Sequence, residues 1–267
     1  MGDSLFARPR FDPLALLAAV ATATRTVTLG TAVLLAPMWH PLPLARVVAT
    51  VDRLAAGRLV LGVGPGPGYG LARKEFAALG VPVEDRLSRL AEIVGLCREL
   101  WGEGPVESDG RWRFRNVDLY PKPVRSGGPP IWWGVRGPRA LALAGAAGEG
   151  WLPVGRSPEE YAAGLATVRA GGPAVTVPAV YLTVAVDADP ARAGQRLQTA
   201  QEDYYRAPWE AIRTLEDHCA GTAADVLAHL DRYVEAGARH VVLRFAGGDP
   251  VVQLRAVLAL LDKRSTG

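Results

Sequence analysis

A short segment in the middle of the chain, Gly134-Val135-Arg136-Gly137-Pro138, has the composition of an anion-binding loop. It follows an apolar run and precedes a segment predicted to be helical from Pro138. The free N–H groups and the dipole of a helix start favour a phosphate, and the Arg136 guanidinium can bind one bidentately. We therefore expect Gly134, Val135, Arg136 and Gly137 to contact a phosphate group. The alternative is a surface arginine in an ordinary loop.

A second segment, 64–68 (GPGPG), follows the apolar run at 58–63. Glycines such as Gly64 and Gly66 let a flat ring approach the backbone closely, and Tyr69 could stack on that ring or simply cover the site. A dinucleotide-binding fingerprint at Gly62-x-Gly64-x-Gly66 is an alternative that the pattern disfavours, because no helix begins at its third glycine and two prolines remove backbone donors. We expect Gly64, Gly66 and Tyr69 to contact a cofactor ring.

His40 lies just before a predicted helix start, in the sequence Trp39-His40-Pro41. A neutral imidazole there could hydrogen-bond a substrate or a neighbouring loop, and an equally good interpretation is a helix-start residue with no chemistry. The remaining histidines are spread through the last third of the chain, and we interpret them as structural or solvated: His218, His229 and His240.

Predicted helices and strands alternate along the sequence. Helices are predicted at 12–24, 41–55, 84–101, 138–147, 158–169, 190–205, 209–215, 222–236 and 250–263. Strands are predicted at 27–35, 58–63, 131–134, 151–154, 176–186 and 240–245, and a surface hairpin at 105–119. Because the strands are continuous apolar runs separated by helices, they indicate a parallel α/β sheet, either a barrel or a doubly wound sheet.

Composition excludes several classes of protein. The chain has 267 residues and a net charge of only +3, which argues against a nucleic-acid binder. Cys97 and Cys219 lack the spacing of metal ligands, so no metal site is expected. No apolar run is long enough to cross a membrane and the first residues do not resemble a signal peptide, so we expect a cytoplasmic protein.

Several blocks in order resemble the bacterial luciferase-like family of flavin- and deazaflavin-dependent oxidoreductases. These blocks are Gly2-Asp3-Ser4, Asp12-Pro13-Leu14, 29–41 (LGTAVLLAPMWHP), 57–66 (GRLVLGVGPG), 120–123 (YPKP), 129–141 (PPIWWGVRGPRAL), 149–153 (EGWLP) and 221–245. The resemblance implies a TIM (β/α)8 barrel with an insertion, here at about 65–125, and a single domain over 1–267. The hairpin expected at 105–119 falls inside that insertion.

The resemblance also implies a departure at the N-terminus. Family members carry a strand, a helix and a second strand before the Gly-Asp that matches Gly2-Asp3. We therefore expect a barrel reduced to about six recognisable strands with two open edges, and we expect the natural protein to be longer.

In TIM barrels the active site lies at the carboxyl ends of the strands. By resemblance, Thr31, Ala32 and Val33 lie in the third barrel strand, and Ala32-Val33 forms a bulge with a non-proline cis peptide that backs the cofactor ring. Asp3 matches an aspartate on the substrate side of the ring, where it could relay a proton. A general rule for barrels offers a second phosphate site at the last loops, here 246–249.

Three positions depart from named subgroups of the family. Luciferase proper has a phosphate-binding arginine where this chain has Pro65. The glucose-6-phosphate-oxidising deazaflavin enzymes have an acidic residue at Pro67 and a catalytic histidine at Ser4. The Gly137-Pro138 pair is similar to the deazaflavin members.

The resemblance leaves three functions open. It favours hydride transfer between coenzyme F420 and a small organic substrate, with Asp3 and His40 as candidate catalytic residues. The alternatives are an FMN-dependent monooxygenase that uses O₂ and a non-catalytic cofactor-binding remnant. The implied partners are a small-molecule substrate and a second copy in a homodimer, with neither nucleic acid nor membrane.

Overall fold

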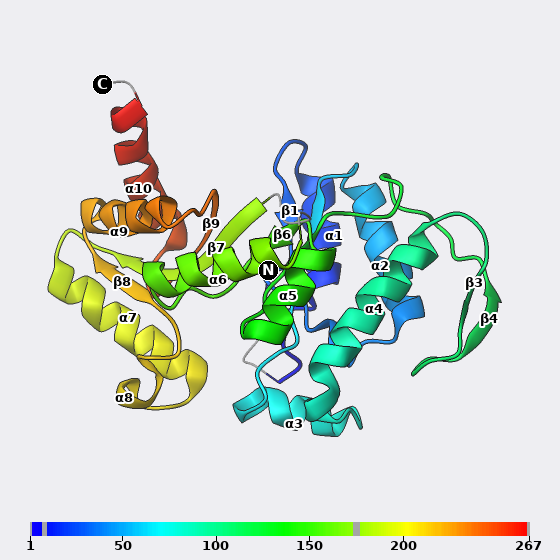
Figure 1. The fold of residues 1–267 in the computed structure, drawn as a ribbon. Coiled ribbons are helices and arrows are strands. Elements are labelled where there is room, and N and C mark those ends of the chain that lie inside the picture. The colour runs from blue at the N-terminus through cyan, green and yellow to red at the C-terminus, as the bar shows by residue number, and fades with distance from the viewer. Residues whose placement is uncertain (1, 7–9, 173–176, 266–267) are drawn as a thin grey trace.

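The computed structural model describes residues 2–6, 10–172 and 177–265. Its longer helices are α1 (Pro13–Ala23), α2 (Pro41–Leu54), α3 (Gly70–Ala78), α4 (Arg86–Trp101), α5 (Pro138–Ala147), α6 (Pro158–Ala170), α7 (Pro190–Tyr205), α9 (Ala223–Glu235) and α10 (Pro250–Ser265), with the short α8 (Trp209–Ile212) after α7. Helices and strands alternate along most of the chain (Figure 1).

In the described residues, seven strands form one parallel sheet. They are β1 (Leu29–Gly30), β2 (Leu59–Val63), β5 (Ile131–Trp133), β6 (Gly150–Trp151), β7 (Val177–Val186), β8 (His218–Gly221) and β9 (His240–Phe245). The path runs β1-β2-β5-β6-β7, and then β8 and β9 both pair with β7. Thr183 and Val184 have a partner in each of these two strands, so β8 and β9 lie on opposite edges of β7.

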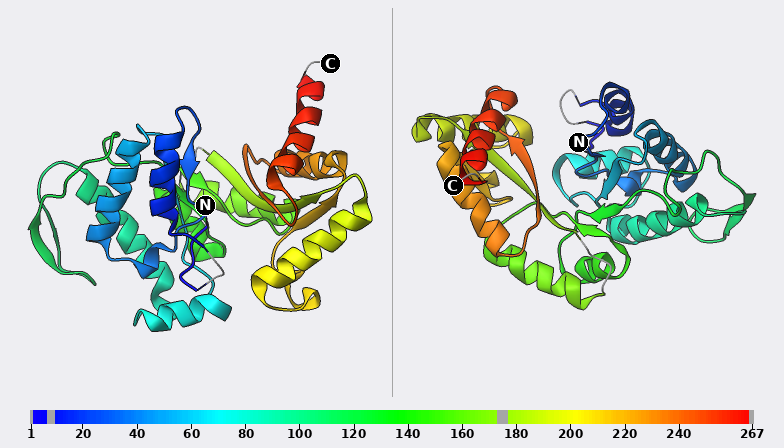
Figure 2. Two further views of the ribbon diagram at one scale, coloured as in Figure 1. Left: turned by 180° about the vertical axis from the view of Figure 1, so that it is seen from behind. Right: turned by 90° about the horizontal axis from the view of Figure 1, so that it is seen from above.

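The sheet is curled and open, and its two faces are covered differently (Figure 2). We call inner face the one that carries the cluster of Ala32, Val33, Val60, Trp132, Leu152, Val177, Ala179, Tyr181 and Val242. Helices α9 and α10 pack on the outer face of the last strands, where Val226 and Val257 contact Val184 and Val186. Helix α7 covers the inner face near the ends of β7 and β9 through Leu197.

A separate antiparallel hairpin projects from the body of the molecule (Figure 1). It consists of β3 (Val106–Ser108) and β4 (Phe114–Val117), with Ser108 opposite Phe114. The hairpin predicted at 105–119 is therefore confirmed. Trp112 at its tip is only 7% exposed, so the hairpin is anchored to the body by an aromatic side chain.

The predicted fold class is confirmed, since the sheet is parallel and helix-covered like an opened barrel. Two elements were missed. Helix α3 follows a run of glycine and proline that favours a loop, and β8 is a four-residue strand of small and polar residues without an apolar run. None of the helices in the described part of the chain has the length and apolarity needed to cross a bilayer.

The strand predicted at 27–35 was too long. Regular pairing covers Leu29–Gly30 alone, and an isolated bridge joins Leu34 to Val63. Between them Thr31 bonds the sheet through its side chain, because its Oγ1 donates to the Gly62 carbonyl at 2.6 Å. Residue 176, where the fifth predicted strand begins, lies outside the described residues.

Candidate functional site

The Val33 side chain fills space that side chains at two glycine positions would otherwise need. A Cβ atom on Gly64 would lie 2.5 Å from Val33 Cγ2, and one on Gly134 would lie 2.7 Å from Val33 Cγ1. Carbon atoms do not pack this closely, so a side chain at either position would displace Val33. At this place the inner face presents the isopropyl group of Val33 between the backbone of Gly64 and that of Gly134. Three segments that the sequence analysis singled out separately therefore lie side by side.

The segment before Val33 has the geometry that the resemblance implies. The Ala32-Val33 peptide bond is cis. Thr31 is 3% exposed and bonds the Gly62 carbonyl, while both Ala32 and Val33 belong to the inner-face cluster. A contact of these three residues with a cofactor stays a prediction.

Asp3 lies against the same segment. Its Oδ2 accepts a hydrogen bond of 3.0 Å from the Leu35 backbone N–H. Burial raises the pKa of Asp3 most, the Leu35 hydrogen bond opposes this shift, and the negative charges of Asp12 and Glu75 add to it. The raised pKa makes this carboxyl better able to carry a proton near neutral pH than an ordinary aspartate.

Glu75 of α3 holds the N-terminal segment in place. Its side chain is 1% exposed, and Oε1 accepts hydrogen bonds from the Ser4 hydroxyl and, at 2.8 Å, from the Phe6 backbone N–H. Sequence reasoning missed Glu75 because α3 itself was not predicted. The position of Asp3 therefore depends on a helix in the predicted insertion.

The loop before α5 leaves its helix start uncapped. Gly137 is the N-cap residue with φ of 84° and offers no side chain to the first-turn N–H groups. Side-chain oxygens cap the starts of α1, α6, α7 and α9, those of Asp12, Ser157, Asp189 and Thr222, whereas α3, α4 and α8 begin without a side-chain cap, as α5 does. The free N–H groups at α5 are consequently available to an anion.

Arg136 adds positive charge to this helix start. Its Nη2 donates to the Val154 carbonyl at 2.6 Å, which fixes the guanidinium beside the loop. Partial removal from water lowers the pKa of Arg136, and the neighbouring Arg156 charge lowers it further. Two arginines held this close favour binding of a negative group, which would relieve their mutual repulsion.

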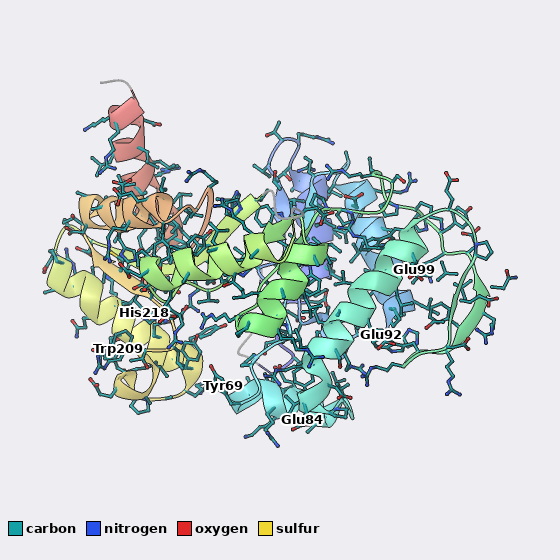
Figure 3. The ribbon with its side chains drawn as sticks, viewed as in Figure 1. Tyr69, Glu84, Glu92, Glu99, Trp209 and His218 are labelled. Atoms are coloured by element: carbon teal, nitrogen blue, oxygen red, sulfur yellow. The ribbon has the colours of Figure 1, made fainter. Side chains whose placement is uncertain are left out.

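A cavity of about 380 Å³ opens beside this loop, between α5 and α6. Arg136, Arg156 and Glu160 are its charged lining residues, and Leu141 and Trp151 are among its apolar ones. Tyr69, at the start of α3 (Figure 3), is 60% exposed and close enough to Arg136 to influence its pKa. The structure thus brings the two predicted glycine segments, Tyr69 and Arg136 to one edge of the sheet.

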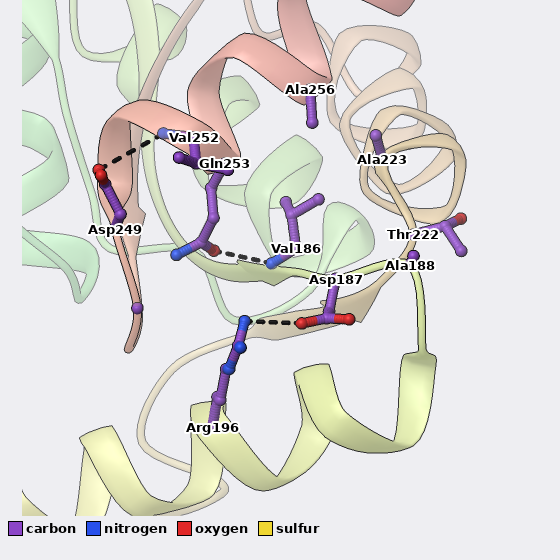
Figure 4. A pocket seen from close by; sticks show the side chains of 11 residues that line it. Val186, Asp187, Ala188, Arg196, Thr222, Ala223, Asp249, Val252, Gln253 and Ala256 are labelled. Atoms are coloured by element: carbon purple, nitrogen blue, oxygen red, sulfur yellow. Dashed lines mark hydrogen bonds and ion pairs between the residues drawn. The ribbon is translucent and has the colours of Figure 1, made fainter.

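The alternative phosphate site at 246–249 lies in a different pocket of about 560 Å³ (Figure 4). Its one arginine, Arg196, is paired with Asp187 at 2.7 Å. Asp249 caps α10, since its Oδ1 accepts from the Val251 N–H at 2.7 Å. Because the cation is neutralised and the helix start is already capped by a carboxylate, this pocket suits phosphate less well than the α5 loop.

His40 caps α2. Its Nδ1 accepts from the Leu42 N–H at 3.2 Å, and its ring meets the edge of Trp112 with centroids 6.2 Å apart. Burial and then the charge of Arg89 lower the pKa of His40, which favours the neutral form of the ring. The contacts described for His40 are those of a helix-start residue, and a contact with substrate stays a prediction.

A buried polar network that sequence reasoning missed lies between α7 and the inner face of β7 and β9. Glu216 is 5% exposed and accepts hydrogen bonds from Gln201 Nε2 (2.6 Å), Thr183 Oγ1 (3.0 Å), Tyr205 Oη (3.1 Å) and Arg244 Nη2 (3.2 Å). Burial raises the pKa of Glu216, but the hydrogen bond from His218, the Arg244 charge and the Gln201 hydrogen bond outweigh it and lower the pKa to about 2.

His218 belongs to this network and is not a solvated surface residue. Its ring stacks at a tilt on Trp209 with centroids 5.2 Å apart (Figure 3), and its Nε2 lies 3.6 Å from Glu216 Oε1. The sequence did carry one signal for the network, an arginine inside the apolar run HVVLRF, because a cation in a predicted strand needs a partner.

Known proteins with similar sequences include F420-using and flavin-using enzymes. The F420-dependent glucose-6-phosphate dehydrogenase of Mycobacterium avium (strain 104) is 35% identical over 149 residues, which are 55% of this chain and 44% of that protein. The oxygenase component of flavin-dependent trigonelline monooxygenase from Acinetobacter baylyi is 32% identical over 134 residues, 50% of this chain and 36% of that protein. The chain thus spans less than half the length of these curated relatives.

Solved structures match nearly the whole chain. The monooxygenase RslO1 from Streptomyces bottropensis has a TM-score of 0.81 and 25% identity, covering 96% of this chain and 84% of that one. An F420-dependent secondary alcohol dehydrogenase, solved with an F420-acetone adduct, has a TM-score of 0.80 and 22% identity, covering 96% and 86%.

The sequence pattern of the luciferase-like monooxygenases matches residues 1–240. This span ends at the first residue of β9, so it leaves out the rest of β9, the loop that follows it and α10. The chain therefore belongs to the family of luciferase-like monooxygenases.

Proposed function

We propose that this protein is an oxidoreductase that binds coenzyme F420 at the inner face and transfers hydride between it and a small organic substrate. The observation that carries the proposal is the joint position of two features at one sheet edge. Val33 lies between Gly64 and Gly134 on a surface of bare backbone, and Gly134 is followed directly by the uncapped start of α5. A flat ring fits the first feature and a phosphate fits the second.

The residues present fit such a cofactor. The N–H groups of the first turn of α5 and the Arg136 guanidinium would hold its phosphate, with Arg156 adding to the positive field. Val33 would support the ring from one side. When bound, the deazaflavin ring supplies the hydride chemistry, and the protein supplies orientation and electrostatics.

Asp3 would serve the substrate side. Its carboxyl is fixed by the Leu35 N–H, and its raised pKa would favour holding a proton that it could give to a substrate oxygen. Tyr69 would cover the open edge of the ring. His40 would stabilise the start of α2 through its cap and could also contact the substrate.

An FMN-dependent monooxygenase is the second candidate. The match to the trigonelline monooxygenase component and the structural likeness to RslO1 support it, because these proteins are named as monooxygenases. Against it, the arginine that binds phosphate in luciferase proper is replaced by Pro65. We rank F420 first for that reason and because Gly137-Pro138 resembles the deazaflavin members.

A fluorescence titration with F420, repeated with FMN as competitor, tests the proposal. Saturable F420 binding that FMN does not reverse is expected. Arg136→Ala should weaken F420 binding by about 10- to 150-fold, the equivalent of one charged hydrogen bond, whereas Arg255→Ala on exposed α10 removes the same charge without effect. Binding of FMN alone would favour the monooxygenase, and binding of neither would favour a non-catalytic remnant.

A further inference from the structure

Two arginines from opposite ends of the chain meet at one tyrosine of α7. The Cζ atoms of Arg10 and Arg244 lie 5.5 Å and 4.5 Å from the Tyr204 ring centroid. Arg10 also donates from Nη2 to the Tyr204 hydroxyl at 3.1 Å, across 194 positions of sequence. The ring therefore holds two guanidinium groups close together, at a surface where the Tyr204 side chain is 44% exposed.

The Arg244 guanidinium is hydrogen-bonded to the buried network through one nitrogen and keeps donors for a ligand on the others. Its Nη2 donates to the Gln201 amide oxygen and to Glu216 Oε1, and Glu216 is itself fixed by several donors. Among the hydrogen bonds of the described residues, those of Arg244 involve Nη2, so Nη1 and Nε keep donors for another acceptor. The side chain is 22% exposed, which makes these donors reachable.

This guanidinium lies on the face of the sheet that carries the proposed cofactor site. Arg244 pairs with Thr183, and Val242 pairs with Tyr181, two residues earlier on each strand. Side chains two apart on a strand share a face, and both Val242 and Tyr181 belong to the inner-face cluster with Val33. Arg10 approaches the same region from the N-terminal segment, where its Nη1 lies 3.5 Å from the Asp3 carbonyl oxygen.

We propose that Arg244, assisted by Arg10, binds a carboxylate group of the substrate on the inner face, and that Glu216 is the positioning residue that fixes Arg244. This inference rests on the proposed function in one respect, since it assigns the bound acid as the substrate of that site. The protein's own carboxylates near Arg244 and Arg10 do not occupy the position proposed for the substrate carboxylate. Glu216 lies behind Arg244 in the network, and Asp3 bonds the Leu35 N–H.

Binding of small acids against their neutral amides gives the direct test. Benzoate with benzamide and pyruvate with pyruvamide serve as probes, on the whole chain with and without F420, and the readouts are the rise in Tm and ligand NMR. Benzoate or pyruvate should bind at least about tenfold tighter than its amide. Arg244→Gln should remove that preference and leave the F420 Kd unchanged, and Arg244→Lys should retain part of it.

Arg255→Gln is the matched control, because it removes one exposed positive charge from α10. Glu216→Gln should reduce the preference for acids without changing the F420 Kd, and far-UV circular dichroism checks that it folds. An unchanged preference in Arg244→Gln, or no preference in the parent chain, overturns the inference. If Arg255→Gln also lost the preference for acids, the preference would be a general effect of charge, and this result would overturn the inference as well.

The outcomes separate this inference from the proposed function. Acid binding that depends on Arg244 in a chain that does not bind F420 would reject the cofactor and retain the arginine site. F420 binding without discrimination between benzoate and benzamide would do the reverse.

Discussion

The contact between Val33 and the two glycines makes a quantitative prediction through Gly64→Ala. The new methyl carbon would lie 2.5 Å from Val33 Cγ2 and 3.2 Å from the Gly134 carbonyl oxygen. The φ angle at Gly64 is not in the left-handed region, so the backbone itself accepts alanine. The cost therefore comes from overpacking, which is typically about 1–3 kcal/mol in a well-packed site.

The size of this effect can be checked by thermal and urea unfolding. A loss of about 2 kcal/mol corresponds to a fall in Tm of roughly 4–8 °C for a protein of this size. Val33→Ala should relieve the clash, because the nearest atoms are then the Gly134 oxygen at 3.2 Å and Val33 Cβ at 3.6 Å. The double variant should be little less stable than Val33→Ala alone, with a coupling of at least about 1 kcal/mol.

Gly95→Ala is the control for the loss of a glycine. It lies in α4 with nothing within 4 Å of the added carbon, and alanine there should stabilise the helix by about 0.5–1 kcal/mol. If Gly64→Ala were neutral, or if its cost simply added to that of Val33→Ala, the packing argument would be refuted. Under the proposed function F420 affinity gives a second readout, since a displaced Val33 would no longer support the ring.

Three further predictions concern stability and reactivity. The pKa of Glu216 is lowered to about 2 in the folded protein, so Glu216 stabilises the fold above its unfolded pKa, and this contribution is lost as the pH falls toward about 2. Near pH 7 the Glu216→Gln variant should be roughly 3–5 kcal/mol less stable than the parent. Urea titrations near pH 3 should show a smaller difference in stability between the two proteins. Thr222→Ala breaks the capping box of α9 and should cost about 0.5–2 kcal/mol by urea unfolding, and no loss would show that the cap is dispensable. Burial raises the pKa of the Cys97 thiol to about 12, so a thiol reagent should modify it at the rate of global unfolding, and faster labelling would contradict its burial.

Much of the framework was predictable because its signals are local. Pro at a first helical position, preceded by Asp or Ser, marked α1, α6 and α7, and a capping box marked α9. Continuous apolar runs marked most of the parallel strands. Helix α3 lacked such a signal, since its N-cap residue Tyr69 makes no side-chain cap and the residues before it are breakers.

In the candidate site, too, the features with local sequence signals were predictable and the contacts between distant segments were not. The α5 loop was predictable because glycine, arginine and a helix start are adjacent in the sequence. The contact of Val33 with Gly64 and Gly134 depends on the registers of three strand ends, which no local pattern records. Resemblance to known enzymes supplied Ala32 and Val33, and only the structure showed what fills the space at the glycines.

The polar network at Glu216 explains why an open sheet can keep a charged residue on its inner face. A lone arginine in β9 would be costly to bury, but Glu216 lies two residues before the start of β8, and the register of both strands against β7 brings the two charges together at Thr183. Gln201 and Tyr205 of α7 then donate further hydrogen bonds to the carboxylate. The helix that covers the inner face is thus fixed by the same carboxylate that orients Arg244, so substrate preference and the docking of α7 should change together when Glu216 is replaced.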